Sequence, residues 1–271
     1  MAQAAADRLQ TRLMSAAVGI PILLVAIAAG SYWTAAVAAL AAAVALVELG
    51  ALLRDGGRSP LVYEGAAWGA ATVAVAPRDA GTVLLALAAG GLAVLATAVG
   101  TRRSAAAFVD WLVTAGGVAY VALPLNALVL LREGDAGVSW LIVAFFATFA
   151  TDTGSYAVGK LVGRHRMAPR LSPGKTWEGA AGGVAAGVGA TVGLVAVLSP
   201  IETAAWAAAL LGLGIALAAQ AGDLVESAIK RRAGAKDSGR LIPGHGGLLD
   251  RLDSLVPVFP LVYYASAVWP G

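Results

Sequence analysis

The sequence lacks cysteine and is poor in charge. Of its 271 residues, only 13% are Asp, Glu, Lys or Arg, about half the share found in an average soluble domain. The absence of cysteine excludes disulfides, thiolate zinc sites and cysteine nucleophiles. The low charge and the 59% of hydrophobic residues together exclude a water-soluble enzyme and a disordered chain.

Long apolar runs fill most of the chain. A transmembrane helix needs about 20 mostly apolar residues, and the sequence offers about nine such stretches between breaks with turn or charge signals. They lie near residues 13–30, 32–53, 61–76, 81–99, 107–131, 138–160, 177–198, 203–225 and 252–269. The sequence therefore predicts an all-α, polytopic integral membrane protein with about nine transmembrane helices.

The predicted helices divide into two regions. We expect about five transmembrane helices in residues 1–136, and the helices that carry the chemistry in residues 137–271, with long loops at 161–176 and 226–251. In the second region, Gly179, Gly183 and Gly187 recur at every fourth position. Small residues at this spacing let transmembrane helices approach closely, so we expect these glycines to serve packing.

Basic residues are distributed unevenly between alternate connections. The N-terminus and every second loop hold 17 of the 19 lysines and arginines, and the other side holds only Arg78 and Arg132. Basic loops of multi-pass proteins face the cytoplasm. We therefore expect a protein of the cell (inner) membrane with a cytoplasmic N-terminus, and a site that faces the cytoplasm.

The two long loops carry more positive charge than orientation requires. Together with Lys160, which directly precedes the first loop, they hold 11 of the 19 basic residues. This favours an anionic ligand, with anionic lipid headgroups as the alternative. In the first loop a Pro-Gly turn precedes Lys175 and Thr176. The phosphate-binding pattern G-x4-G-K-[ST] fails because Pro169 stands where glycine is required. Anion binding at the following helix start and simple loop-to-helix punctuation are both open interpretations.

Acidic residues gather at the ends of the last two predicted spans. Ionisable groups in spans are costly and usually functional. Asp223 lies at the end of the eighth span, and Asp250 and Asp253, three positions apart, are expected on one helix face at the start of the ninth. Because magnesium takes a few carboxylates together with substrate phosphates, these three residues predict a hard-cation site. Charges that complement the helix dipole are the alternative for Asp250 and Asp253.

Two other polar residues have open interpretations. His245 is surrounded by glycine, which lets the backbone approach a ligand. Asp152, in the run TDTGSY, is either a site carboxylate or a polar packing residue. No role is assigned to Glu48, Glu64 or Asp110.

The run SAIKRRAGAKDSGRLIPGHGGLLDRLD, residues 227–253, resembles the signature of the phosphatidate cytidylyltransferases. The preceding GDLVE and the earlier LSPGKTWEG are also similar to that family. The resemblance implies condensation of CTP with phosphatidic acid, which gives CDP-diacylglycerol and pyrophosphate. It also implies Mg²⁺ as cofactor, with a second cation as an open addition, a contact with membrane lipid, and no nucleic acid partner.

The resemblance also implies roles for individual residues. Metal ligands would be Asp223, Asp250 and Asp253. The catalytic set would be Asp223, Lys236, Asp237, His245, Asp250 and Asp253. Candidates for contacts with substrate phosphates would be Ser172, Lys175, Thr176, Ser227, Lys230, Arg231, Arg240 and Arg251.

Two other classes of protein compete with this interpretation. A secondary transporter of an anionic substrate also uses charged residues in broken helices, but it places them near the membrane midplane. A CDP-alcohol phosphotransferase needs a D-G-x2-A-R run, which does not follow Asp55-Gly56. Homodimer formation is left open by the sequence.

Overall fold

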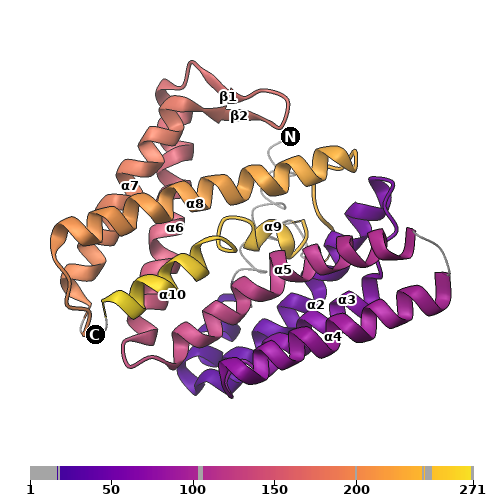
Figure 1. Cartoon of the computed structure of the whole chain (residues 1–271). Coiled ribbons are helices and arrows are strands. Elements are labelled where there is room, and N and C mark those ends of the chain that lie inside the picture. Colours follow the sequence, from indigo (N-terminus) through magenta and orange to yellow (C-terminus); the bar gives the residue numbers. More distant parts are fainter. Residues whose placement is uncertain are drawn as a thin grey trace. The chain divides into compact units, whose positions relative to one another are not determined.

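The computed structural model describes residue 17 and residues 19–102, 106–198, 200–239, 241 and 246–269. A short apolar helix, Gly19–Ala29, comes first. It is followed by α2 (Ser31–Asp55), α3 (Val62–Ala74), α4 (Ala80–Arg102), α5 (Ala106–Glu133) and α6 (Gly137–Val162) (Figure 1). A hairpin of β1 (Arg166–Ala168) and β2 (Ser172–Thr176) then leads into α7 (Trp177–Val197), α8 (Ala205–Arg232), α9 (Leu249–Leu252) and α10 (Val258–Val268).

The helices confirm the predicted all-α, multi-pass membrane fold. Within the described residues, six helices are long and apolar enough to cross a membrane, namely α2, α4, α5, α6, α7 and α8. The other three predicted spans hold the shorter helices Gly19–Ala29, α3 and α10. A count of nine spans therefore stays a prediction.

Two helix boundaries differ from the predicted ones. Helix α8 continues to Arg232, beyond the predicted end at residue 225, so Ser227, Lys230 and Arg231 lie on a helix rather than in a loop. The predicted last span is interrupted, because α9 ends at Leu252 and α10 begins only after Pro257. Proline has no backbone N–H to continue a preceding helix and suits a helix start. The expectation that Asp250 and Asp253 share one helix face is therefore wrong.

The chain forms two compact units. Unit 1 comprises the described residues of Met1–Val129 and Arg232–Leu252, and unit 2 those of Leu130–Arg231 and Asp253–Gly271. Apart from a few residues at helix ends, unit 1 contains α2 to α5 and α9, and unit 2 contains α6, the hairpin, α7, α8 and α10.

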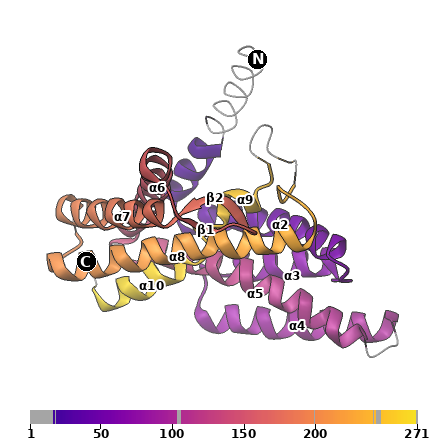
Figure 2. The same ribbon diagram turned by 90° about the horizontal axis from the view of Figure 1, so that it is seen from above.

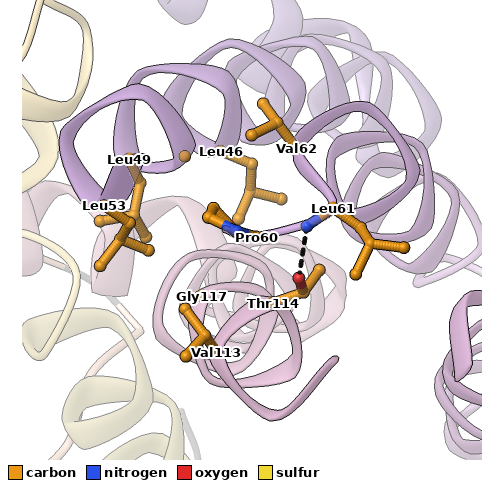
Figure 3. Close-up of a pocket in the computed structure, with 11 residues that line it drawn as sticks. Leu46, Leu49, Leu53, Pro60, Leu61, Val62, Val113, Thr114 and Gly117 are labelled. Carbon is orange, nitrogen blue, oxygen red and sulfur yellow. Dashed lines mark hydrogen bonds between the residues drawn. The ribbon is translucent and has the colours of Figure 1, made fainter. Parts of the chain in front are cut away.

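In unit 1, α2 packs against α3, and α3 packs against α4. A Cβ atom at Gly50 would lie 2.6 Å from the Val62 side chain, so glycine lets α2 and α3 approach closely. Figure 3 shows a pocket lined by apolar side chains from α2, α3 and α5. At its edge the backbone N–H of Leu61, just before α3, donates to Thr114 Oγ1 on α5 at 2.9 Å. This bond satisfies a donor that the helix start would otherwise leave unpaired.

In unit 2, α6 and α7 lie side by side (Figures 1 and 2). A Cβ atom at Gly179 would stand 2.7 Å from the Ser155 carbonyl oxygen, and one at Gly183 or Gly187 would collide with the hydroxyl of Ser155 or Thr151. The predicted packing role of these glycines is confirmed. The close approach fixes the start of α7, and with it the hairpin, against α6.

Candidate active site

The hairpin of unit 2 holds the predicted phosphate-binding loop. Strands β1 and β2 are antiparallel, with Arg166 opposite Thr176 and Ala168 opposite Ser172. Thr176 is the N-cap of α7, because its Oγ1 accepts a hydrogen bond from the Gly179 N–H at 3.0 Å. Glu178, in the first turn of α7, accepts hydrogen bonds from the backbone N–H groups of residues 164 and 165. These two caps tie both ends of the hairpin to the helix start.

Lys175 extends from this hairpin to α8. Its Nζ lies 2.7 Å from Asp223 Oδ2, and both side chains are partly exposed. Ser227, one helical turn after Asp223, donates from Oγ to Asp223 Oδ1 at 3.3 Å. The Asp223 carboxylate is therefore held by an ammonium on one oxygen and by a hydroxyl on the other.

Asp253 lies beside Asp223 because the turn before α10 packs against α8. A Cβ atom at Gly222 would collide with the Asp253 carbonyl oxygen and would stand 2.8 Å from Pro257, so only glycine fits at position 222. Asp253 precedes α10 and lies outside the six long helices. Burial raises the pKa of its carboxyl, and the negative charge of Asp223 raises it further. A site that crowds two carboxylates in this way favours a bound cation.

A second ion pair lies one turn further along α8. Lys230 Nζ contacts Glu226 Oε2 at 2.7 Å, and the Glu226 side chain is completely buried. Glu226 also lies close to Asp253, and the Lys230 charge acts on Asp253. The two pairs and Asp253 therefore form one network on the α8 side of unit 2.

Asp152 on α6 belongs to the same network. It interacts electrostatically with Asp253, Asp223 and Lys175. Of its two open interpretations, these neighbours favour a site carboxylate. The signal in the sequence was an ionisable residue within an apolar span.

The donor set of unit 2 suits a hard cation. Mg²⁺ binds through one or two carboxylates and completes its shell with water and phosphate oxygens. Asp223 and Asp253 supply two neighbouring carboxylates, and the Lys175 ammonium shows that a cation is already accepted beside Asp223. Within the described residues, no three His, Asp or Glu side chains come close enough to hold one metal ion. The unit therefore suits a cation that shares its shell with a ligand, rather than a closed protein cage.

Two more of the predicted phosphate contacts lie near the hairpin. Arg231, at the end of α8, donates from Nε to the Leu171 carbonyl at 3.2 Å. Ser172 is half-buried at the start of β2. Unit 2 therefore brings together Ser172, Lys175, Thr176, Asp223, Ser227, Lys230, Arg231 and Asp253 from the predicted set.

The other predicted residues that the structure describes lie in unit 1. Asp250, in α9, is buried, and its Oδ2 accepts hydrogen bonds from the N–H groups of Ser238 and Gly247, both at 2.8 Å, and from Ser238 Oγ at 2.9 Å. Lys236, Asp237 and Arg251 are exposed. Arg240 and His245 lie outside the described residues. The assignment of Asp250 to one cation site with Asp223 and Asp253 stays a prediction.

Glu48 is one of the acidic residues of unit 1 to which the sequence assigned no role. It lies on α2 and is buried. Its carboxylate accepts from the N–H groups of Leu248 and Leu249 at 3.0 and 2.8 Å, and Ser238 Oγ lies 3.1 Å from its Oε2. Its partners are about 200 positions away in the chain, so only its position within an apolar run could have drawn attention to it.

The fold and the site define the class of protein: an all-α, multi-pass membrane protein in which two carboxylates of one long helix, α8, are paired with lysines. Comparison with known proteins gives the family. A model described as "Cytidylyltransferase family" matches residues 10–269, and the chain belongs to this family.

Several curated relatives carry the name phosphatidate cytidylyltransferase. One from Brucella suis is 39% identical over 156 residues, which cover 57% of this chain and 57% of the relative. One from Mycobacterium tuberculosis is 42% identical over 132 residues, or 49% of this chain and 39% of the relative. One from Staphylococcus saprophyticus is 38% identical over 145 residues, or 54% and 55%. The chain thus matches about half the length of these relatives.

Proposed function

We propose that this protein is a phosphatidate cytidylyltransferase, a nucleotidyltransferase of phospholipid biosynthesis. It would join CTP to phosphatidic acid and release pyrophosphate. The observation that carries the proposal is the Asp223 carboxylate, which is held by Lys175 and Ser227 beside Asp253. Membership of the family and the names of the curated relatives support the substrates.

The reaction needs charge neutralisation more than a strong base. A phosphate monoester has a second pKa of about 6, so the lipid phosphate is already an oxyanion nucleophile at neutral pH. One of its oxygens forms a bond to the α-phosphorus of CTP. The bond between that phosphorus and the oxygen leading to the β-phosphate breaks, and its electron pair leaves with pyrophosphate. Catalysis is then a matter of positioning two polyanions and stabilising the leaving charge.

Individual residues have separable parts in this proposal. Asp223 and Asp253 would hold Mg²⁺ in unit 2, and Asp250 stays a predicted ligand from the sequence. A bound divalent cation neutralises phosphate charge and stabilises the leaving oxygen. Lys175, on the hairpin, would move from Asp223 to a substrate phosphate once the cation takes over the carboxylate. Lys230 would keep the buried Glu226 neutralised throughout.

The direct test is a reconstituted assay. Purified protein in lipid vesicles receives CTP labelled at the α-phosphorus, phosphatidic acid and Mg²⁺, and we expect labelled CDP-diacylglycerol and one pyrophosphate per product. Omission of phosphatidic acid or of Mg²⁺ is the matched control. Uptake of a labelled anion into sealed vesicles, without CTP-dependent pyrophosphate release, would instead identify a transporter.

The proposal places the site on the cytoplasmic face of the cell membrane, where CTP is available. The chain has no cysteine, so single cysteines can report sidedness. Arg58→Cys and Asp135→Cys are both at exposed positions, and we expect an impermeant thiol reagent to label them from opposite sides. Labelling from the same side would contradict the predicted topology. Homodimer formation is a separate prediction, which the mass of the detergent-solubilised protein checks.

A further inference from the structure

We infer that Glu48 is a positioning residue that holds the segments 238–239 and 246–250 and, through them, the Asp250 carboxylate. The inference rests on the proposed function, in which Asp250 takes part. All the contacts that carry it lie within unit 1.

Both oxygens of the Glu48 carboxylate accept hydrogen bonds from the segment 246–250. Oε1 accepts the Leu248 N–H at 3.0 Å, and Oε2 accepts the Leu249 N–H at 2.8 Å. These donors are the N–H groups at the start of α9, which have no partner within the helix. A carboxylate that bridges two successive N–H groups fixes both the position and the orientation of the helix start. Asp250 is the next residue of α9.

Ser238 couples Glu48 to Asp250. Its Oγ lies 3.1 Å from Glu48 Oε2 and 2.9 Å from Asp250 Oδ2, and it accepts from the Asp250 N–H at 3.3 Å. A hydroxyl has one proton and can donate to one carboxylate at a time. A change at Glu48 therefore alters the hydrogen bond that the Ser238 hydroxyl donates to Asp250.

The backbone around Glu48 is shaped to fit the carboxylate. A Cβ atom at Gly239 would lie 2.7 Å from Glu48 Oε1, and one at Gly247 would collide with Oε2. Gly246 adopts a φ of +82°, which glycine tolerates and other residues avoid. These three glycines thus bring the backbone within reach of Glu48, which is itself buried in an otherwise apolar stretch of α2.

The test replaces Glu48 with an isosteric residue. In Glu48→Gln the amide keeps the size, but an NH₂ donor replaces one of the two acceptor oxygens, so it cannot accept from Leu248 and Leu249 on separate atoms as the carboxylate does. We expect kcat to fall by about 10- to 100-fold, the range for residues that orient metal ligands, and the Mg²⁺ concentration for half-maximal activity to rise. Glu64→Gln, at an exposed position of α3, removes the same charge and is expected to leave both values unchanged.

A second readout does not depend on activity. Hydrogen exchange of peptides that cover 246–252 reports the N–H groups bound by Glu48, and we expect them to exchange roughly 2- to 10-fold faster in Glu48→Gln, the fold-change for one lost hydrogen bond. Peptides of α4 and α5 serve as the internal reference. Ser238→Ala is expected to act non-additively with Glu48→Gln in a double-mutant cycle.

The outcomes separate the positioning role from the proposed function. If Glu48→Gln lowers only the melting temperature while kcat and the Mg²⁺ response stay as in the wild type, Glu48 is a stability residue and the inference is wrong. Unchanged exchange in 246–252 would also overturn it, even if the wild-type protein were inactive with CTP and phosphatidic acid. That inactivity alone would count against the proposed function.

Discussion

Unit 1 and unit 2 both hold carboxylates of the candidate site, and different groups hold these carboxylates in the two units. In unit 2, Asp223 and Glu226 each pair with a lysine ammonium at 2.7 Å. In unit 1, Glu48 and Asp250 accept hydrogen bonds from backbone N–H groups and from the Ser238 hydroxyl. A lysine is a long, mobile point charge, so it can yield its place to a metal ion or move to a phosphate. Backbone donors are fixed, so they hold a carboxylate in one orientation.

We therefore expect the lysines of unit 2 to exchange partners when substrate and cation bind, and the carboxylates of unit 1 to keep one orientation. Variants that remove a charge without changing the shape of the side chain test this difference between the units. In unit 2 such variants should affect stability or substrate use, depending on burial. In unit 1 they should affect the rate through orientation.

The largest expected effect is on stability, from Lys230→Met. The completely buried Glu226 carboxylate loses its ammonium partner, which costs about 3–5 kcal/mol for a broken buried pair. Denaturation in detergent, followed by circular dichroism, measures this change. The double variant Lys230→Met/Glu226→Gln should recover much of the loss, and Lys160→Met, at an exposed site on α6, should change little. Equal stability of Lys230→Met and Lys160→Met would contradict a role for the pair.

The next effect concerns Asp250→Asn. The asparagine Oδ1 can accept the hydrogen bonds from Ser238 and Gly247, so we expect the protein to fold. If Asp250 binds the cation, the initial rate should fall at least about 100-fold, because the metal supplies several kcal/mol of charge stabilisation. Asp55→Asn, at an exposed position of the same unit, is the matched control. A folded variant with most of its Mg²⁺-dependent activity would assign Asp250 to structure alone.

A smaller effect is expected at Lys175. Lys175→Ala deletes the charge on the hairpin and should raise the KM for CTP roughly 10-fold, as for a lost charge-assisted contact, whereas Lys175→Arg keeps the charge and should raise it less. Steady-state kinetics with CTP as the varied substrate measures the difference. Wild-type kinetics for both variants would show that the hairpin only joins α6 to α7.

The smallest expected effect tests the helix cap. Thr176→Val removes the acceptor for the Gly179 N–H and should lower the unfolding free energy by about 1 kcal/mol. Thr176→Ser keeps the cap and should change stability little. If Thr176→Val has normal stability and a raised KM for CTP, the hydroxyl contacts a phosphate instead of capping α7.

The sequence predicted the membrane fold well because long apolar helices leave a local signal. It also predicted the close packing at Gly183 and Gly187, since spacing along one helix determines which residues face a neighbour. The extension of α8 to Arg232 was missed because basic residues resemble a loop by hydropathy. At the C-terminal end of a helix they are in fact favoured by the dipole.

The contacts that shape the site could be predicted less well. Spacing did not predict that α9 ends at Leu252, before Asp253, or that the Asp253 backbone packs against Gly222 of α8. The partners of Glu48 lie about 200 positions away, and no local pattern announces such a contact. Motifs therefore indicated which residues matter, but only tertiary packing shows which carboxylate is paired with lysine and which is held by backbone.

The central claim is that the Asp223 carboxylate of unit 2 supports nucleotidyl transfer from CTP to phosphatidic acid. The most direct measurement is the initial rate of pyrophosphate and CDP-diacylglycerol formation by wild-type, Asp223→Asn and Asp135→Asn proteins in the same vesicles with Mg²⁺. Asp135 is an exposed acid of the same unit. The account predicts equal rates for the wild type and Asp135→Asn, and a rate at least about 100-fold lower for a folded Asp223→Asn. A folded Asp223→Asn protein that forms both products at the wild-type rate would contradict it.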